Sequence, residues 1–177
     1  NAHTMAAGAQ GTYRSEGGHN TGRVGIARYA YDFDNWIPGF VDAFSLPQPR
    51  DPARRLPKGS YAQVHLGVGA TDIGGVCVGL FGRWHGATEI QNATCDLGLV
   101  VSNDGLHFRE PSQETVFLDY RDSPAKPHRE RQFHTNLCQA NGILNVDDET
   151  WIYHGRWRNT GFHHMDKYYS EIALATI

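Results

Sequence analysis

Short apolar runs separated by turn residues dominate this chain. Residues 95–108 show the pattern most clearly, because larger apolar residues alternate with a glycine and a valine over positions 97–101. Both faces of such a strand are apolar, as expected of a strand packed between two layers. Asp104 and Gly105 then supply a tight turn, and the aromatic Phe108 returns to the core.

The same order of strand, Asp-containing turn and aromatic residue returns along the chain. Residues 24–36 repeat it, with Gly25 standing 73 positions (98 − 25) before Gly98. A second element, Gly-Arg-Trp after an apolar strand, begins at Gly82 and again at Gly155, also 73 positions (155 − 82) apart. A third copy of the first element begins near Ile172, 75 positions (172 − 97) after its counterpart in the second copy. One period shared by two elements predicts repeated units of short strands, as in β-propeller blades.

The remaining pattern predicts an all-β protein without a convincing amphipathic helix. Segments 37–60 and 119–132 carry several prolines and are expected to cross between units on the surface. The expected strands cover residues 11–14, 61–68, 76–84, 96–101, 115–118, 142–146, 150–155 and 168–177.

The repeat length sets the expected domain organisation. The 177 residues hold about 2.4 repeats (177/73), whereas propellers have roughly four to eight blades. We therefore expect residues 1–177 to form a single partial β-propeller domain, with units ending near residues 36 and 108 and a third running beyond 177. Closure of a ring through another copy of the chain is the alternative.

Composition narrows the classes of partner. The net charge is −3 and no basic run stands out, so no nucleic-acid partner is expected. No apolar run approaches the ~18 residues of a membrane helix, and no membrane partner is expected. The three cysteines form no CxxC pair, and neither a zinc site nor a disulfide framework is predicted. Composition does not determine the oligomeric state or the cellular location of the protein. A secreted or periplasmic location is compatible with it.

Three segments of the chain resemble a known family. Residues 99–108, 141–155 and 170–177 resemble strand-and-turn segments of the five-bladed β-propeller glycoside hydrolases of families 43 and 32 and their uncharacterised relatives. The resemblance spans roughly residues 24–177 and rests on scaffold residues. It implies a five-bladed propeller that hydrolyses a glycosidic bond with a carboxylic acid and a carboxylate facing each other in its central funnel.

Two carboxyl groups are candidates for these catalytic roles. Asp51 lies in an Arg-Asp-Pro triplet that resembles the auxiliary Asp motif of family 32, although no strand follows it directly; a surface turn is the alternative. Glu130 lies between two arginines just before an expected innermost strand, which suits a general acid whose neighbours tune its pKa. A solvated ion pair is the alternative for Glu130. Asp96 precedes a strand and fits either a site or a structural role.

The repeated Gly-Arg-Trp element supplies candidate sugar-binding residues. An arginine beside a tryptophan could form a structural cation–π pair or a platform that stacks on a sugar and donates to its hydroxyls. The candidate substrate-binding residues are Arg83, Trp84, His85, His134, Arg156 and Trp157. No metal ligand set and no cofactor is predicted, although Ca²⁺ in a central channel is compatible with such propellers. The alternative to a hydrolase is a non-catalytic carbohydrate-binding or structural propeller.

Overall fold

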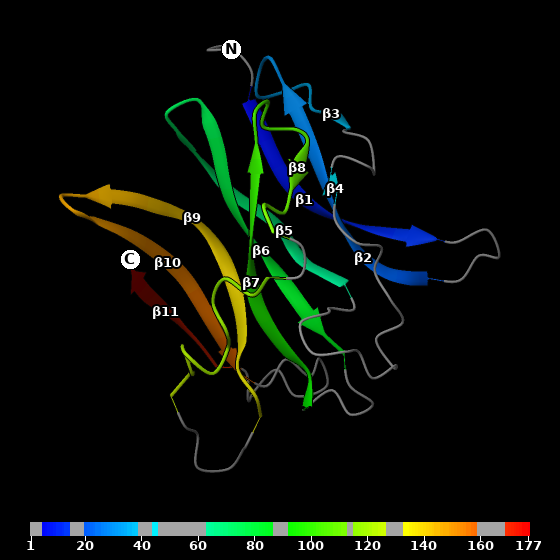
Figure 1. The fold of residues 1–177 in the computed structure, drawn as a ribbon. Helices are drawn as coiled ribbons and strands as arrows, with labels where there is room; N and C mark the ends of the chain where they lie inside the picture. Colours follow the sequence, from blue (N-terminus) through cyan, green and yellow to red (C-terminus); the bar gives the residue numbers. More distant parts are fainter. Residues whose placement is uncertain are drawn as a thin grey trace.

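A computed structural model describes residues 5–14, 20–38, 44–45, 63–86, 92–112, 115–126, 133–158 and 169–177, and this part of the protein is nearly all β (Figure 1). It contains no α-helix, and no helix in these ranges is long and apolar enough to cross a membrane. The strands are β1 (Met5–Arg14), β2 (Asn20–Ala30), β3 (Ile37–Pro38), β4 (Phe44–Ser45), β5 (Gln63–Ile73), β6 (Val76–His85), β7 (Thr94–Ser102), β8 (Phe108–Arg109), β9 (Asn136–Val146), β10 (Glu149–Arg158) and β11 (Tyr169–Thr176).

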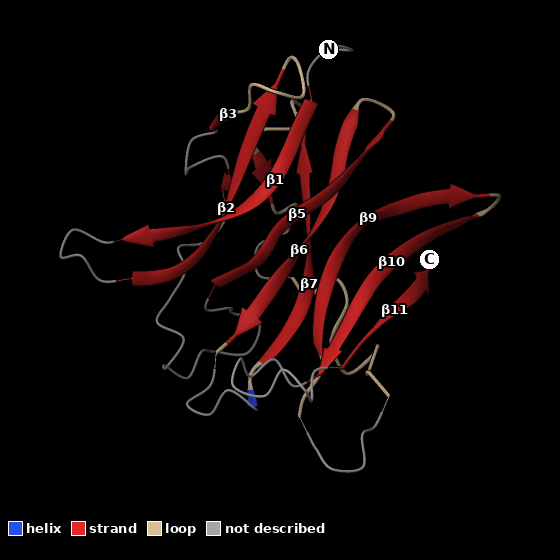
Figure 2. Cartoon of the chain, turned by 180° about the vertical axis from the view of Figure 1, so that it is seen from behind, coloured by secondary structure: helices blue, strands red, loops and turns tan. Residues whose placement is uncertain are grey.

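The strands form a small sheet and a large one. The small sheet has the order β1-β2-β3, and we call it the first sheet. The large sheet has the order β11-β10-β9-β7-β6-β5, with β8 pairing with β7 and β4 with β8. Within it, β7 and β9 run parallel and share one residue pair, Cys95 with Asn136. The large sheet is therefore two antiparallel units, the middle unit (β5–β8) and the last unit (β9–β11), which fan apart in Figure 2.

The sequence repeat corresponds to a repeat of strand register. The middle and last units begin at residues 63 and 136 and turn at residues 74–75 and 147–148, with an offset of 73 in both cases. Gly82 lies opposite Leu97 across β6 and β7, and Gly155 lies opposite Ile172 across β10 and β11. The predicted repeat is thus confirmed at the level of paired strands, whereas the closed propeller ring stays a prediction.

The first strand of each unit, β5 or β9, has a bulge at an equivalent place, and a hydrogen bond between the two bulges joins these strands. The β5–β6 register skips Leu66 and Gly67, whose φ angles are 63° and 78°, and the β9–β10 register also skips two residues after Gln139. The Gln139 side-chain Nε2 donates a hydrogen bond of 2.9 Å to the Gly67 carbonyl. Because a bulge turns backbone groups out of their own ladder, it offers this carbonyl to the neighbouring strand. The inner strands β5 and β9 are tied together in this way.

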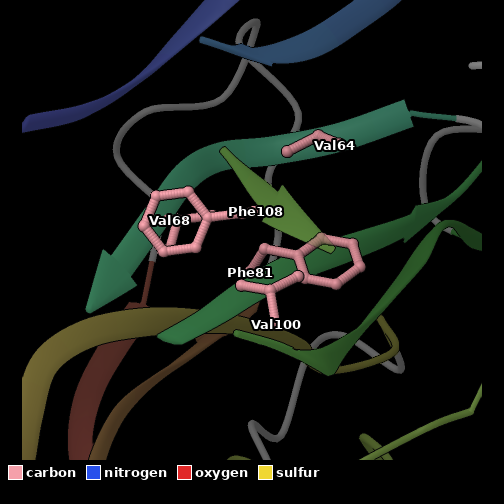
Figure 3. Close-up of a cluster of buried hydrophobic side chains, with 5 residues drawn as sticks. All are labelled: Val64, Val68, Phe81, Val100 and Phe108. Carbon is pink, nitrogen blue, oxygen red and sulfur yellow. The ribbon is translucent and has the colours of Figure 1, made fainter. Parts of the chain in front are cut away.

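The middle unit is buried on both faces. On one face, a cluster of apolar side chains from β5, β6, β7 and β8 fills the interior (Figure 3): Val64, Val68, Phe81, Val100 and Phe108. On the other face, Leu80 and Leu97 pack against Leu137, Ile143 and Ile152 of the last unit. The sequence prediction of a strand with two apolar faces at residues 97–101 is therefore confirmed.

The turn after β7 forms as the sequence predicts, whereas the strand expected at residues 115–118 does not form. Asp104 Oδ1 accepts the N–H groups of Leu106 and His107 at 2.8 Å, which confirms the predicted Asp turn after β7. The sequence predicts a fourth strand of the middle unit at residues 115–118, and this prediction is wrong. Within this segment only Leu118 pairs, in an isolated bridge with Leu97. The Leu97 carbonyl accepts the N–H groups of both Phe117 and Leu118. That geometry ends the ladder after one step.

Candidate functional site

The two Arg-Trp pairs lie at the same end of the large sheet. Strands β5, β7, β9 and β11 begin at this end, and β6 and β10 finish there. Arg83 and Trp84 stand near the end of β6, and Arg156 and Trp157 stand at the equivalent positions of β10. We call this the site end, because it gathers most of the sequence-predicted binding residues.

Each repeated arginine faces a carboxylate across the sheet. Arg83 lies opposite Asp96 on β7, and Arg156 lies opposite Glu171 on β11. Directly opposed residues on antiparallel strands have neighbouring side chains. The Nη1 atom of Arg156 is 3.7 Å from Oε1 of Glu171, and both Arg83 and Asp96 are buried. The Arg-carboxylate pairing therefore repeats with the fold.

Asp96 orients a histidine that reaches solvent. Its Oδ2 atom lies 2.6 Å from Nε2 of His85, and its Oδ1 atom accepts the backbone N–H of Tyr120 at 2.9 Å. The side chain of His85 is 22% exposed, against 7% for Asp96. A carboxylate that holds an imidazole in one orientation leaves the ring's other nitrogen for an external partner. His85 is accordingly the accessible member of the pair.

Tyr120 connects the Asp96–His85 pair to His134, because its N–H donates to Asp96 and its ring contacts the His134 ring. The rings of Tyr120 and His134 meet edge to face, with centroids 5.8 Å apart, and His134 is exposed. Arg121 lies over the same tyrosine ring at 5.8 Å and donates to both oxygens of Asp119, which lowers the pKa of that carboxyl group. The structure thus brings the predicted residues His85 and His134 into one chain of contacts.

A buried Ser-His-Arg cluster ties the following loop to β10. The Ser123 Oγ atom lies 2.6 Å from Nε2 of His154 and accepts a hydrogen bond of 2.8 Å from Nε of Arg156. Burial lowers the pKa of His154, and the nearby Arg156 charge adds to this effect. The ring is therefore neutral near pH 7. Its Nδ1 atom lies 3.3 Å from the Ile152 carbonyl, which can only accept, so Nδ1 carries the hydrogen and Nε2 accepts from the serine hydroxyl. No sequence signal marked Ser123, because the cluster joins segments about thirty residues apart.

Residues of the last unit also anchor the loop that precedes β9. Arg158 donates to the carbonyl of Phe133 at 3.0 Å and to the carbonyl of Ala125. Glu171 accepts the N–H of Lys126 at 3.1 Å and the hydroxyl of Tyr169 at 2.9 Å. Burial raises the pKa of Glu171, but these hydrogen bonds outweigh it, and the net shift is downward.

The two tryptophans of the repeat both contact one histidine. The His65 ring centroid is 5.2 Å from that of Trp84 and 5.7 Å from that of Trp157. Trp84 is buried with Ala93 and Cys95, whereas Trp157 is only half-buried. Of the two tryptophans, Trp157 is the one with a ring surface that a ligand can reach.

The predicted catalytic residues lie outside the described part of the protein. Asp51 falls within residues 46–62 and Glu130 within residues 127–132. Among the described residues, no group of three or more His, Cys, Asp or Glu side chains is arranged to hold a metal ion. Cys77, Cys95 and Cys138 form no disulfide with one another.

Comparison with known proteins finds solved structures that are similar to this protein. No protein-family model and no curated protein matches this sequence. The protein is similar to part of a solved BT0996–RGII complex, with a TM-score of 0.49 and 11% identity over 99% of this chain and 54% of that one. It is also similar to a structure described as a glycoside hydrolase, with a TM-score of 0.47 and 10% identity over the same shares. It spans about half the length of each.

Proposed function

We propose that the protein is a β-propeller glycoside hydrolase whose sugar-binding face is the site end. The observation that carries the proposal is the partly exposed pair of Arg156 and Trp157 at this end, since Arg83 and Trp84 at the equivalent positions of the middle unit are buried. Aromatic faces stack on the apolar C–H surface of a sugar, and guanidinium and imidazole groups donate to its hydroxyls. Among the described residues, His85, His134, Arg156 and Trp157 combine this chemistry with exposure.

The proposal assigns hydrolysis to Glu130 and Asp51. Both belong to segments that lead into inner strands at the site end, since Gln63 begins β5 and Asn136 begins β9. Glu130 protonates the leaving oxygen, Asp51 takes the auxiliary role beside this acid, and a further Asp activates water or attacks the sugar.

A specific observation favours carbohydrate binding without hydrolysis as the second candidate. Asp96, Asp119 and Glu171, which are carboxylates of the described site end, are each held by donors of the protein itself. Carboxylates whose oxygen atoms already accept hydrogen bonds from protein groups have a structural role and do not attack a sugar. If Glu130 and Asp51 do not line the same face, the site end binds sugars through its histidines and Trp157 alone.

Hydrolysis of an oligosaccharide panel by paired variants tests the catalytic assignment. Glu130→Gln removes the proposed acid at nearly constant size, and we expect the rate to fall about 10²–10⁴-fold. Asp148→Asn is the matched control, because this exposed carboxylate lies in the β9–β10 hairpin turn, at the opposite end of the unit. Equal rates for wild type and Glu130→Gln would show that Glu130 is not the acid.

Binding measurements on the same panel separate the two candidate functions. We expect Trp157→Ala and His85→Ala to weaken binding about tenfold each, as the loss of one stacking or hydrogen-bonding group does. Binding without any hydrolysis by the wild type would support the second candidate. Neither binding nor hydrolysis across the panel would overturn both.

A further inference from the structure

The repeat between the middle and last units changes in character at His85. His85 ends β6 and Arg158 ends β10, 73 positions (158 − 85) later, and each lies opposite the first residue of the third strand of its unit. Arg158 donates to two backbone carbonyls that precede β9, which is a structural role. His85 instead pairs with the side chain of Asp96, and 22% of its own side chain is exposed. Because functional groups are added to a common scaffold, this departure from the repeat points to a binding role for His85.

Asp96 determines which ring nitrogen of His85 carries the hydrogen. Its Oδ2 atom lies 2.6 Å from Nε2, and a carboxylate can only accept a hydrogen bond, so Nε2 is the protonated nitrogen. The N–H of Tyr120 donates to Oδ1 at 2.9 Å and fixes the carboxylate in turn. In the neutral ring the other nitrogen, Nδ1, is then a hydrogen-bond acceptor.

The charged neighbours of His85 leave this acceptor to an external partner. Hydrogen bonds from Arg121 chiefly, and the nearby imidazole of His85 to a smaller extent, lower the pKa of the Asp119 carboxyl group. Arg121 donates to both oxygens of Asp119, so these two charges satisfy each other. In the part of the chain that the structure describes, His85 forms its hydrogen bond through Nε2, and no group donates to Nδ1.

We propose that Nδ1 of His85 accepts a hydrogen bond from a sugar hydroxyl, and that Asp96 is the positioning residue that keeps the ring in this acceptor form. The inference rests on the proposed function, since it takes the ligand of the site end to be a sugar. It also defines a specificity. A free hydroxyl can donate to Nδ1, whereas an O-methyl group or an ionised carboxylate presents acceptors alone, and two facing acceptors repel.

Replacement of Asp96 with Asn tests the positioning role. The amide oxygen should stay on the N–H of Tyr120, which requires an acceptor, so the amide NH₂ group faces Nε2 and the ring hydrogen moves to Nδ1. Nitrogen NMR of histidine-labelled protein at pH 8 should show this change of tautomer in Asp96→Asn, with His85→Gln used to assign the signal. Asp148→Asn, in the β9–β10 turn, should keep the wild-type tautomer. An unchanged tautomer in folded Asp96→Asn protein would overturn the positioning role.

Two amide variants of His85 test the hydroxyl contact, with a neutral oligosaccharide of the same panel as the probe. The amide of Asn occupies the place of Nδ1, whereas Gln places its amide at Nε2 and keeps only the contact with Asp96. We expect His85→Gln to weaken binding at pH 8 about tenfold and His85→Asn about threefold or less.

The order of the two losses decides the contact. Equal losses, or a larger loss for His85→Asn, would overturn the hydrogen bond through Nδ1 and leave the proposed function intact. Wild-type protein that binds no sugar of the panel would overturn the proposed function and the sugar contact together. The tautomer seen by NMR needs no ligand, and it tests the role of Asp96 in either case.

Discussion

The Nε2 atom of His85 lies 2.6 Å from Oδ2 of Asp96, and the histidine is the member of this pair that meets solvent. The buried carboxylate also accepts the N–H of Tyr120, so it links β6, β7 and the loop after residue 118. A single side chain therefore fixes both the exposed histidine and the loop that carries the Tyr120 ring. Substitution of Asp96 should therefore change both the affinity for a ligand at His85 and the stability of the fold.

Replacing Asp96 with Asn should destabilise the protein by about 1–3 kcal/mol. The amide keeps an oxygen for Tyr120 but loses the charge of a buried carboxylate that lies 2.6 Å from Nε2 of His85. Urea unfolding at pH 7 measures the change, and Asp148→Asn should stay within about 0.5 kcal/mol of wild type. Equal stability of the two variants would mean that the Asp96 charge contributes nothing to the fold.

Gly98→Ala should destabilise the middle unit by about 1–3 kcal/mol through overpacking. A Cβ at this position would lie 2.7 Å from Cζ of the Phe81 ring and 2.9 Å from Cδ of Arg83, both completely buried. Phe81→Leu shortens the blocking side chain, so the double variant should lose less stability than the sum of the two single variants. Additive losses, measured by thermal or urea unfolding, would show that the two positions do not clash.

Much of the fold followed from local patterns in the sequence. The 73-residue offset between Gly82 and Gly155 predicted equivalent register, because both glycines lie opposite the third strand of their unit. Asp104 predicted its turn, because an aspartate after a strand can accept the following N–H groups. These features depend on residues that are close in the sequence or that repeat at a constant offset, and they can therefore be predicted from the sequence pattern.

The candidate site was less predictable, since it depends on contacts between distant segments. Ser123 and His154 meet across 31 positions, and Asp96 and Tyr120 across 24, with no shared motif. The sequence showed Asp96 only as a carboxylate before a strand and could not separate a structural role from a catalytic one. Burial and the identity of its partners make that distinction, and neither follows from spacing.

The buried His154 should make stability depend on pH below neutrality. Burial lowers its pKa in the folded state below the ordinary value of 6.5, so the unfolded state takes up its proton first as the pH falls. This histidine's contribution is fully present above about pH 6.5 and is lost as the pH falls toward its lower folded-state pKa. The free energy of unfolding of the wild type should thus approach that of His154→Gln between pH 7.5 and 5.

Asp104 should show a pH dependence in a more acidic range. Burial raises the pKa of its carboxyl group, but hydrogen bonds from the His107 backbone and ring, Leu106 and Ser102 outweigh this effect, and the pKa falls well below 3.8. The carboxylate therefore stabilises the turn above about pH 4, and this contribution is lost as the pH falls below 3.8. Because half of the side chain is exposed, we expect Asp104→Ala to cost only about 0.5–1.5 kcal/mol at pH 7. The difference from wild type should shrink between pH 4 and pH 2, as followed by urea unfolding. A difference that stays constant over this range would mean that the charge of Asp104 does not hold the turn, and that its backbone conformation alone does.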